Sequence, residues 1–409
     1  MSKFLTLDDV NVKDKVVLVR VDFNSPVDPK TKKVLEDTRI RTHAEATIKE
    51  LEDKGARTVI LAHQGRLGDS DFIPLKQHAE ILSKILKKPV KYVEDLYGEK
   101  AKTAIRNLGS GEILLLENVR TFPLETKDGT PEEQAKTALV RNLAPLADLF
   151  VNDAFAAAHR AHVSIVGFTA VLPSVAGRIM ERELKSLTKV LEKPEKPCIF
   201  VLGGAKADDS LEISKYVLDK GIADHILTGG VVGLIFLVAK RYNLGKQNME
   251  FLEKEDLMKL VPGIRDLTHS YESSIRTPVD VAVDMNGKRS EISVTELPTE
   301  YSIFDIGVKT VGDYCNILRK AKSIVVSGPM GKYEDAKFRY GTKTILEEIA
   351  QSGVFSIAGG GHTIAALELF DLTDKVSYVS TAGGALVEFL MGKKLPGVVA
   401  LEKAATRKR

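Results

Sequence analysis

Short apolar runs alternate with amphipathic stretches along almost the whole chain. Runs rich in Val, Ile and Leu have the length and composition of β-strands, and they lie at residues 16–21, 58–62, 112–116, 148–153, 198–202, 225–229, 323–328, 354–359 and 376–380. Many are continuously apolar, which is typical of parallel strands buried on both faces. The stretches between them favour helices, such as residues 43–55, which end at the cap residue Gly55. The pattern predicts an α/β fold with doubly wound, Rossmann-like parallel sheets.

The pattern is interrupted at residues 173–196. This stretch holds a charged helical segment between prolines, which is typical of a connection between domains. A chain of 409 residues is also too long for one ordinary core. We therefore predict a first domain at 1–172, a hinge helix at 173–196 and a second domain at 197–385. Whether residues 386–409 return to the N-terminal domain stays open.

The composition excludes several classes of protein. Apolar residues make up 44% of the chain and charged residues 28%, which is typical of a folded globular protein. The net charge of +3 and the lack of a long basic block disfavour nucleic-acid binding. The two cysteines, Cys198 and Cys315, are too few for a disulfide framework or a thiolate metal site. The N-terminus lacks the apolar run of a signal peptide, and the most apolar stretch, residues 229–239, is too short to span a bilayer. We expect a cytoplasmic protein with no membrane partner.

The first predicted strand ends in polar residues that suit a small anionic ligand. Arg20, Asp22 and Asn24 alternate along VVLVRVDFNSP, so they are expected to project from one face at the carboxyl end of the strand. In an open α/β sheet, ligands bind at that edge. One guanidinium, one carboxylate and one amide favour a polyhydroxylated anion. From this segment alone, a strand end with solvated polar residues is the alternative.

The N-terminal half repeats this feature at later strand ends. Polar and charged residues follow the strands or lie in the next turn: Asp37, Arg39, Arg41, His63, Arg66, Glu117, Asn118, Arg120, Asn152, Asp153, His159, Arg160 and His162. A parallel sheet brings its carboxyl ends together, so we expect the cations around one cleft. They would repel each other there unless a phosphate or carboxylate lies between them. Arg39 and Arg41 are expected in a turn after Asp37.

Glycine-rich turns follow or adjoin the strands of the C-terminal half, at residues 202–206, 228–230, 327–331, 358–363 and 381–385. Glycine lets backbone N–H groups approach a ligand, and a following helix N-terminus favours phosphate, although tight turns need glycine in any case. The chain lacks GxxxxGK[ST], a GxGxxG after a strand, the HRD and DFG signatures, and HExxH. An anion-binding half joined by a hinge to a nucleotide-binding half is the layout of a two-substrate kinase, because phosphoryl transfer needs positioning, charge neutralisation and exclusion of water.

Long motifs, in order along nearly the whole chain, resemble those of the phosphoglycerate kinase family. They are VRVDFNSP, AHQGRLG, LLLENVR, FVNDAFAAAHRAH, VLGGAK, SGPMGKYE, AGGGHT and STAGGALVEFLMGKKLPGVVAL. The resemblance implies reversible transfer of the acyl phosphate of 1,3-bisphosphoglycerate to MgADP, giving 3-phosphoglycerate and MgATP in glycolysis and gluconeogenesis. It also implies in-line transfer in a cleft that hinge bending closes.

The resemblance assigns roles to particular residues. Arg39 would stabilise the transferring phosphoryl group, and Lys206 would reach the nucleotide phosphates. Phosphoglycerate would be bound by Asp22, Asn24, Arg39, His63, Arg66, Arg120 and Arg160. The nucleotide would be bound by Gly203, Gly204, Lys206, Gly229, Gly230, Gly307, Glu334, Gly360, Gly361, His362 and Thr363. Glu334 would bind the ribose, and Gly307 would line the adenine pocket.

Three positions depart from the common family pattern and resemble an archaeal-type variant. Ser210 stands where many members carry a second lysine, His362 replaces a metal-associated aspartate, and Val231 replaces the third glycine of a turn. The expected cofactor is Mg²⁺ with ATP or ADP. We assign the ion no protein ligand, because Mg²⁺ usually keeps waters and leans on substrate phosphates.

Two alternatives of different class remain at this point. A catalytically silent homologue could act as a binding scaffold, but intact Arg39 and Lys206 argue against it. An NAD-dependent dehydrogenase would also use α/β sheets, but the dinucleotide motif is missing. The expected assembly is a monomer or a homodimer.

Overall fold

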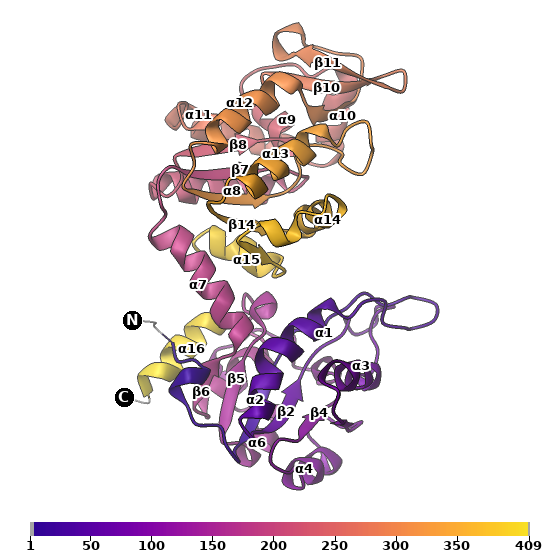
Figure 1. The fold of residues 1–409 in the computed structure, drawn as a ribbon, viewed down its shortest axis with the longest axis vertical. Coiled ribbons are helices and arrows are strands. Elements are labelled where there is room, and N and C mark those ends of the chain that lie inside the picture. Colours follow the sequence, from indigo (N-terminus) through magenta and orange to yellow (C-terminus); the bar gives the residue numbers. More distant parts are fainter. Residues whose placement is uncertain (1–3, 408–409) are drawn as a thin grey trace. The chain divides into compact units, whose positions relative to one another are not determined.

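The computed structural model describes residues 4–407, which fold into two compact units. The N-unit comprises the chain up to Lys185 together with the segment from Lys394 onward, and the C-unit comprises Ser186–Lys393. Helix α7 (Arg178–Glu192) runs without interruption from one unit into the other (Figure 1).

The N-unit is built on a six-stranded sheet in which every paired strand is parallel. The strand order is β3-β4-β2-β1-β5-β6. The strands are β1 (Val16–Arg20), β2 (Arg57–Leu61), β3 (Val90–Tyr92), β4 (Ile113–Leu115), β5 (Leu149–Asn152) and β6 (Ser174–Ala176). All five residues of β1 are buried, as its continuous apolar run predicts. The sheet therefore brings the ends of β4, β2, β1 and β5 to one edge in adjacent positions.

Helices surround this sheet (Figure 1). They are α1 (Thr38–His43), α2 (Lys49–Asp53), α3 (Lys76–Leu86), α4 (Glu99–Arg106), α5 (Pro131–Gln134), α6 (Ala138–Leu143) and α16 (Pro396–Arg407). Shorter 3₁₀ turns are Leu7–Asp9, Val119–Thr121, Ala144–Leu146, Phe155–Ala157 and Phe168–Ala170, and π-helical segments are Ala44–Ile48 and Val163–Gly167. The helix predicted at 43–55 is the π segment and α2, and Gly55 follows its C-cap with φ +73°.

Two N-unit predictions are wrong. Arg39 and Arg41 lie in helix α1 rather than in a turn, because Asp37 is the residue at the N-cap. The segment predicted as one hinge helix begins with a strand, β6, and becomes helical only at Arg178. A run as short as β6, directly after Pro173, carries too little periodicity to separate strand from helix.

The C-terminal helix α16 belongs to the N-unit. Its Gly397 N–H donates to the Ala158 carbonyl at 2.9 Å, and Arg407 donates to the carbonyls of Thr169 and Ala170. The last described residues thus belong to the same unit as the first described ones.

The C-unit has a second parallel six-stranded sheet, in the order β15-β14-β13-β7-β8-β9. Its strands are β7 (Cys198–Leu202), β8 (His225–Thr228), β9 (Ile275–Arg276), β13 (Ser323–Ser327), β14 (Phe355–Gly359) and β15 (Tyr378–Ser380). The predicted strands of this half are confirmed, and so is the α/β class with two parallel sheets.

An antiparallel sheet in the C-unit was not predicted. Its order is β11-β10-β12, with β10 (Asp280–Met285), β11 (Lys288–Ser293) and β12 (Ile303–Ile306). The turn between β10 and β11 is Asn286-Gly287, with φ +54° and +82°. Asn-Gly is a strong hairpin signal that the sequence analysis overlooked.

Helices of the C-unit complete the second α/β arrangement (Figure 1). They are α8 (Ala207–Asp219), α9 (Gly230–Ala239), α10 (Lys246–Lys254), α11 (Val261–Ser270), α12 (Val308–Leu318), α13 (Tyr340–Gln351), α14 (Gly361–Leu369) and α15 (Gly384–Leu390), with 3₁₀ turns Met258–Leu260, Val294–Glu296 and Thr373–Lys375. The strongly apolar α9 is almost wholly buried in this core. In the part of the chain that the structure describes, every helix is too short or too polar to cross a membrane.

Candidate anion and nucleotide sites

The predicted phosphoglycerate residues of the N-unit lie around the carboxyl ends of its central strands. Asp22 follows β1, His63 follows β2 and Arg120 follows β4, and these strands are neighbours in the sheet. Asp22 and His63 are both buried. From helix α1, Arg39 forms an ion pair with Asp22. The strand order therefore assembles residues that are distant in the sequence.

Positive charge accumulates at this edge. Burial and the nearby charges of Arg160 and Arg20 lower the pKa of Arg120 to about 10. Arg66, on an exposed loop, adds to the same effect. Burial and the charge of Arg20 hold the pKa of His63 well below its ordinary value of 6.5. His63 is thus neutral at pH 7, and the guanidinium groups are close enough to repel one another, which favours an anion between them.

Asn24 has a positioning contact in addition to any contact with ligand. Its Oδ1 accepts a hydrogen bond from the Gly65 N–H at 2.8 Å. Arg120 donates to the carbonyl of the same glycine. Only glycine suits position 65, for two reasons. Its φ of +64° is left-handed, and a Cβ there would lie 2.4 Å from the Phe72 nitrogen. Both side chains therefore fix the loop that carries Arg66.

Arg20 does not project toward a ligand, contrary to the expectation. It is 2% exposed, and its Nε donates to Ser164 Oγ at 2.8 Å while Nη2 donates to His63 Nδ1 at 3.1 Å. Alternation along the strand correctly groups Arg20 with Asp22, but it gives no information on whether a long side chain meets protein or solvent. Arg20 is held by buried groups that the pattern could not reveal.

His43 and Asp153 form a buried pair near this edge that the sequence did not predict. His43 was missed: its Nδ1 lies 2.6 Å from Asp153 Oδ2, and its Nε2 accepts the Asp22 N–H at 3.2 Å. Asp153 also accepts the Ile179 N–H at 2.8 Å, at the start of α7. His43 lies four residues after Arg39 in the sequence, which is the one signal that could have placed it on the same helical face.

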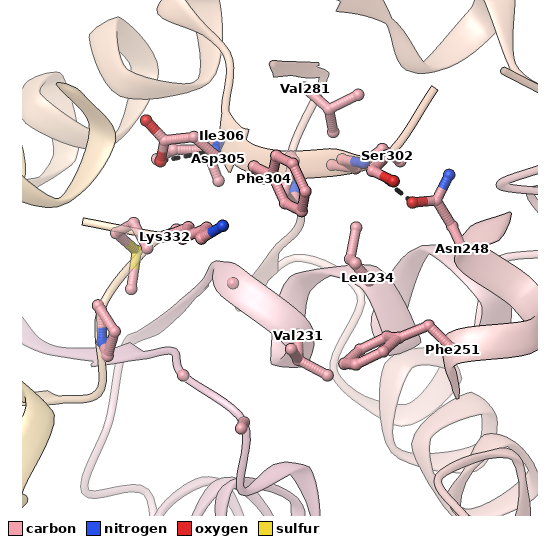
Figure 2. Close-up of a pocket in the computed structure, with 18 of the residues that line it drawn as sticks. Val231, Leu234, Asn248, Phe251, Val281, Ser302, Phe304, Asp305, Ile306 and Lys332 are labelled. Atoms are coloured by element: carbon pink, nitrogen blue, oxygen red, sulfur yellow. Dashed lines mark hydrogen bonds between the residues drawn. The ribbon is translucent and has the colours of Figure 1, made fainter. Parts of the chain in front are cut away.

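The C-unit contains a cavity of about 330 Å³ with largely apolar walls. Figure 2 shows Val231, Leu234 and Phe251 on one side of it and Phe304 with Val281 on the other. A cavity with apolar and aromatic walls of this kind suits a nucleobase. The walls come from α9, α10, β10 and β12, and of these only α9, through Gly230 at its start, was predicted to contact the nucleotide.

Four of the predicted nucleotide residues line the cavity: Gly204, Gly230, Glu334 and His362. Gly307 does not, and Ile306 lines the wall in its place. A Cβ on Gly307 would lie 2.2 Å from the Asp280 carboxylate, so this glycine serves the packing at the start of α12. Gly307 is thus outside the wall of this cavity, and its place beside the adenine stays a prediction.

Two charged groups on the cavity wall were also missed. The Lys332 ammonium lies 4.8 Å from the centre of the Phe304 ring in a cation–π contact, and its side chain extends toward that ring (Figure 2). Asp305 accepts hydrogen bonds from Arg289 Nη1 and the Gly341 N–H, both at 2.7 Å. Burial raises the pKa of Asp305 to about 6 despite these donors.

The glycine turns bring three loops into backbone contact beside the cavity. The Gly204 N–H donates to the Pro329 carbonyl and the Gly230 N–H to the Met330 carbonyl, both at 2.7 Å. A Cβ on Gly203 would lie 2.2 Å from the Pro329 oxygen, and one on Gly229 would lie 2.5 Å from Met330 Sδ. These glycines are needed for close packing of the loops whatever ligand binds.

The remaining nucleotide candidates lie at helix starts. Gly360 is the N-cap of α14, and a Cβ on Gly361 would meet no atom within 4 Å, so this helix N-terminus is open. Thr363 Oγ1 accepts the Gly328 N–H at 2.7 Å and ties the two loops together. An open helix N-terminus is a suitable anion site. His362 Nδ1 lies 3.9 Å from Glu334 Oε1.

Lys206 occupies the N-cap position of α8 and is 81% exposed, with Nζ 4.0 Å from Asp209 Oδ2. Asp208 and Asp209 lie in the first turn of the helix. Ser210 is buried, so its side chain does not face the exposed end where Lys206 lies.

The residues do not form a cage for a divalent cation. Between residues 4 and 407, no three His, Cys, Asp or Glu side chains are grouped in a way that could hold a metal ion. Mg²⁺ prefers oxygen ligands in octahedral geometry. Exposed His362 and Glu334 do not supply such a set.

Comparisons with known proteins agree with this arrangement. The sequence pattern of the family Phosphoglycerate kinase matches residues 7–393. The chain is 49% identical over 402 residues to the phosphoglycerate kinase of Methanothermobacter thermautotrophicus, covering 98% of this chain and 97% of that protein. It is 47% identical to the enzyme of Methanococcus maripaludis, covering 98% of each chain. Both organisms are archaea, which confirms the predicted archaeal-type resemblance.

Solved structures give the same result for the fold. The crystal structure of phosphoglycerate kinase from Pyrococcus horikoshii superposes with a TM-score of 0.89 at 40% identity, covering 99% of this chain and 100% of that one. The enzyme from Coxiella burnetii gives a TM-score of 0.85 at 33% identity, covering 98% and 100%.

Proposed function

We propose how this chain, which belongs to the phosphoglycerate kinase family and is a phosphotransferase with a carboxyl acceptor, carries out its reaction in glycolysis and gluconeogenesis. The terminal oxygen of the ADP β-phosphate attacks the acyl phosphate of 1,3-bisphosphoglycerate in line. The bond from phosphorus to the carboxyl oxygen breaks, and the products are 3-phosphoglycerate and ATP. No proton has to move, so catalysis rests on positioning and charge stabilisation.

Phosphoglycerate binds at the N-unit edge described above. The observation that carries this assignment is the group of mutually repelling guanidinium charges of Arg120, Arg160 and Arg66. An anionic ligand would relieve that repulsion. Asp22 is suited to accept a hydrogen bond from the 2-hydroxyl group, and His63 and Asn24 are suited to donate.

Arg39 stabilises the transferring phosphoryl group. Its ion pair with Asp22 holds the guanidinium at the edge of the anion site, yet about a third of the side chain is exposed. A cation that is held but not fully buried can contact charge that develops between the two substrates.

The nucleotide base occupies the apolar cavity, and the phosphates extend toward Gly360, Gly361 and Thr363 at the start of α14. Lys206 reaches the same phosphates from α8. Glu334 on the cavity wall is placed for the ribose hydroxyls. Members of this family use a magnesium nucleotide. When bound, the ion would neutralise phosphate charge. We assign it no ligand from this chain, because Mg²⁺ usually keeps waters and contacts substrate phosphates.

Closure of a cleft between the two units, with the segment around α7 as the hinge, excludes water during transfer. The two units are continuous through this helix, which supports the assignment. We further propose that the enzyme works in the cytoplasm as a monomer or homodimer. The dehydrogenase alternative is set aside because the chain belongs to the phosphoglycerate kinase family, and a coupled assay of ATP formation tests the scaffold alternative.

Titration calorimetry with 3-phosphoglycerate tests the anion site. Arg120→Met should weaken binding about 10- to 100-fold, since hydrogen bonds to charged groups contribute about 1.5–3 kcal/mol. Lys102→Met, which removes a cation on α4 that pairs with Glu99, is the matched control. Equal affinity in Arg120→Met and the control would refute the assignment.

Small-angle scattering tests closure. The largest compaction should require 3-phosphoglycerate and nucleotide together, because each unit binds one ligand and closure needs contacts with both. Full compaction with either ligand alone would contradict it.

A further inference from the structure

His63 and Arg20 form a hydrogen bond whose polarity is fixed by chemistry. Arg20 Nη2 lies 3.1 Å from His63 Nδ1. A guanidinium has only donors, so Nδ1 must accept and the imidazole proton must be on Nε2. Nε2 forms no hydrogen bond with any residue between 4 and 407. His63 therefore has a free N–H at the anion site.

Arg20 is itself held by a buried carboxylate through one hydroxyl group. Ser164 Oγ accepts from Arg20 Nε at 2.8 Å and donates to Glu125 Oε1 at 2.5 Å. The Ser164 N–H donates to Glu125 Oε2 at 3.0 Å. Arg20, Ser164 and Glu125 are all at most 2% exposed. Burying the opposite charges of Arg20 and Glu125 costs desolvation free energy, and hydrophobic residues at such positions often give a more stable fold.

The other neutral tautomer of His63, with the proton on Nδ1, shows why Arg20 matters. His63 Nδ1 lies 3.9 Å from Asp22 Oδ1. Without Arg20, Nδ1–H would be free to pair with this carboxylate, and the lone pair of Nε2 would then face the ligand. A lone pair repels an anion, whereas an N–H group binds it.

We propose that Arg20 is a positioning residue that holds His63 in the neutral Nε2–H tautomer, and that Glu125 and Ser164 hold Arg20 in place for this purpose. His63 thereby donates a directional hydrogen bond to the anionic ligand without carrying charge. Burial and the cations Arg20, Arg120 and Arg160, which outweigh Asp22, lower the pKa of His63 and keep it neutral. The proposal rests on the binding of phosphoglycerate at His63.

Nitrogen-15 NMR of protein with labelled histidine tests the tautomer, and His63→Gln identifies the His63 signals. In the wild type, Nδ1 should give a pyridine-type signal and Nε2 a pyrrole-type signal. In Arg20→Met, the two signals should shift toward each other or exchange, and 3-phosphoglycerate affinity should fall about 10- to 100-fold. Arg41→Met is the control, because it removes an exposed guanidinium that pairs with Asp37.

Ser164→Ala and Glu125→Gln keep the proposal testable if Arg20→Met does not fold. Ser164→Ala removes the hydroxyl that joins Arg20 to Glu125, and it should shift the His63 signals in the same direction. Unchanged signals and unchanged affinity in the folded variants would overturn the proposal. If the wild type itself fails to bind 3-phosphoglycerate, the proposed function fails, whereas the tautomer measurement in the free protein still decides the role of Arg20.

Discussion

Replacing Glu125 by Gln is expected to flatten the dependence of stability on pH. Glu125 is 1% exposed, and its carboxylate accepts both the N–H and the hydroxyl of Ser164. Burial raises the pKa of Glu125 from 4.5 to about 7, although Arg20 and the Ser164 hydrogen bonds act in the opposite direction. Gln keeps the shape and an acceptor oxygen but cannot ionise.

The sign and size follow from linkage. Because the folded-state pKa is raised, the folded state binds the proton more tightly than the unfolded state does. The resulting stability is fully present below about pH 4.5 and is lost as the pH rises through about 7. As the pH rises from 5 to 8, ionisation of Glu125 should lower the wild-type free energy of unfolding by about 2.5 kcal/mol. This is most of the total loss that the difference between the folded and unfolded pKa of Glu125 allows. The amide side chain of the Glu125→Gln variant contributes no such loss.

Urea unfolding at several pH values, followed by far-UV circular dichroism because the chain has no Trp, measures the difference. The gap in unfolding free energy between variant and wild type should change by about 2.5 kcal/mol from pH 5 to pH 8, in favour of the variant at high pH. Glu132→Gln, which removes an exposed carboxylate on α5, controls for net charge. A gap that stays constant over this range would refute the reasoning. The gain should come with weaker phosphoglycerate binding, since Glu125 anchors Arg20.

Three further substitutions test the site. Arg39→Ala should lower kcat on the order of 10²-fold with little change in KM, because it acts on charge that develops in transfer; steady-state kinetics would contradict this if only KM changed. Lys206→Ala should abolish most turnover in a coupled assay while thermal unfolding stays unchanged, since the side chain is 81% exposed, and an added Ser210→Lys should not restore activity because that position is buried. Near wild-type turnover of Lys206→Ala would remove it from the site. Gly203→Ala should destabilise the C-unit by about 1–3 kcal/mol and raise KM for ATP, because its Cβ would lie 2.2 Å from the Pro329 oxygen; an unchanged Tm would show that the loops adapt.

The sequence predicts the two parallel sheets well because their strands are continuous apolar runs between glycine-rich turns. It fails at β10, β11 and β12, whose outer strand β11 is charged and part-exposed. The Asn286-Gly287 turn was the available signal. The apolar side chains that β10 and β12 contribute to the cavity were missed for the same reason.

At the anion site, the sequence predicts which residues meet but not what each one does. Strand alternation brings Arg20 and Asp22 to one edge, and strand order brings His63 there. Periodicity carries no information about Glu125 and Ser164, which reach Arg20 from segments more than 100 and 140 residues away along the chain. A buried partner at such a distance decides whether a cation binds ligand or positions a neighbour.

The hydrogen-bond donors of the two sites differ in their exposure to solvent, and this difference bears on the order of events. His63 of the N-unit is buried before any ligand binds, whereas the side chains of Lys206 and His362 in the C-unit are 81% and 75% exposed. A desolvated donor interacts strongly with an anion at once, because little water screens it. An exposed ammonium stays screened until water is removed. We therefore expect the His63 N–H to bind an anion without further desolvation in the free protein, and the charge of Lys206 to act at full strength only in the closed state proposed above. Lys206 would then stabilise phosphate charge mainly during transfer, which lowers the barrier, and less during nucleotide binding.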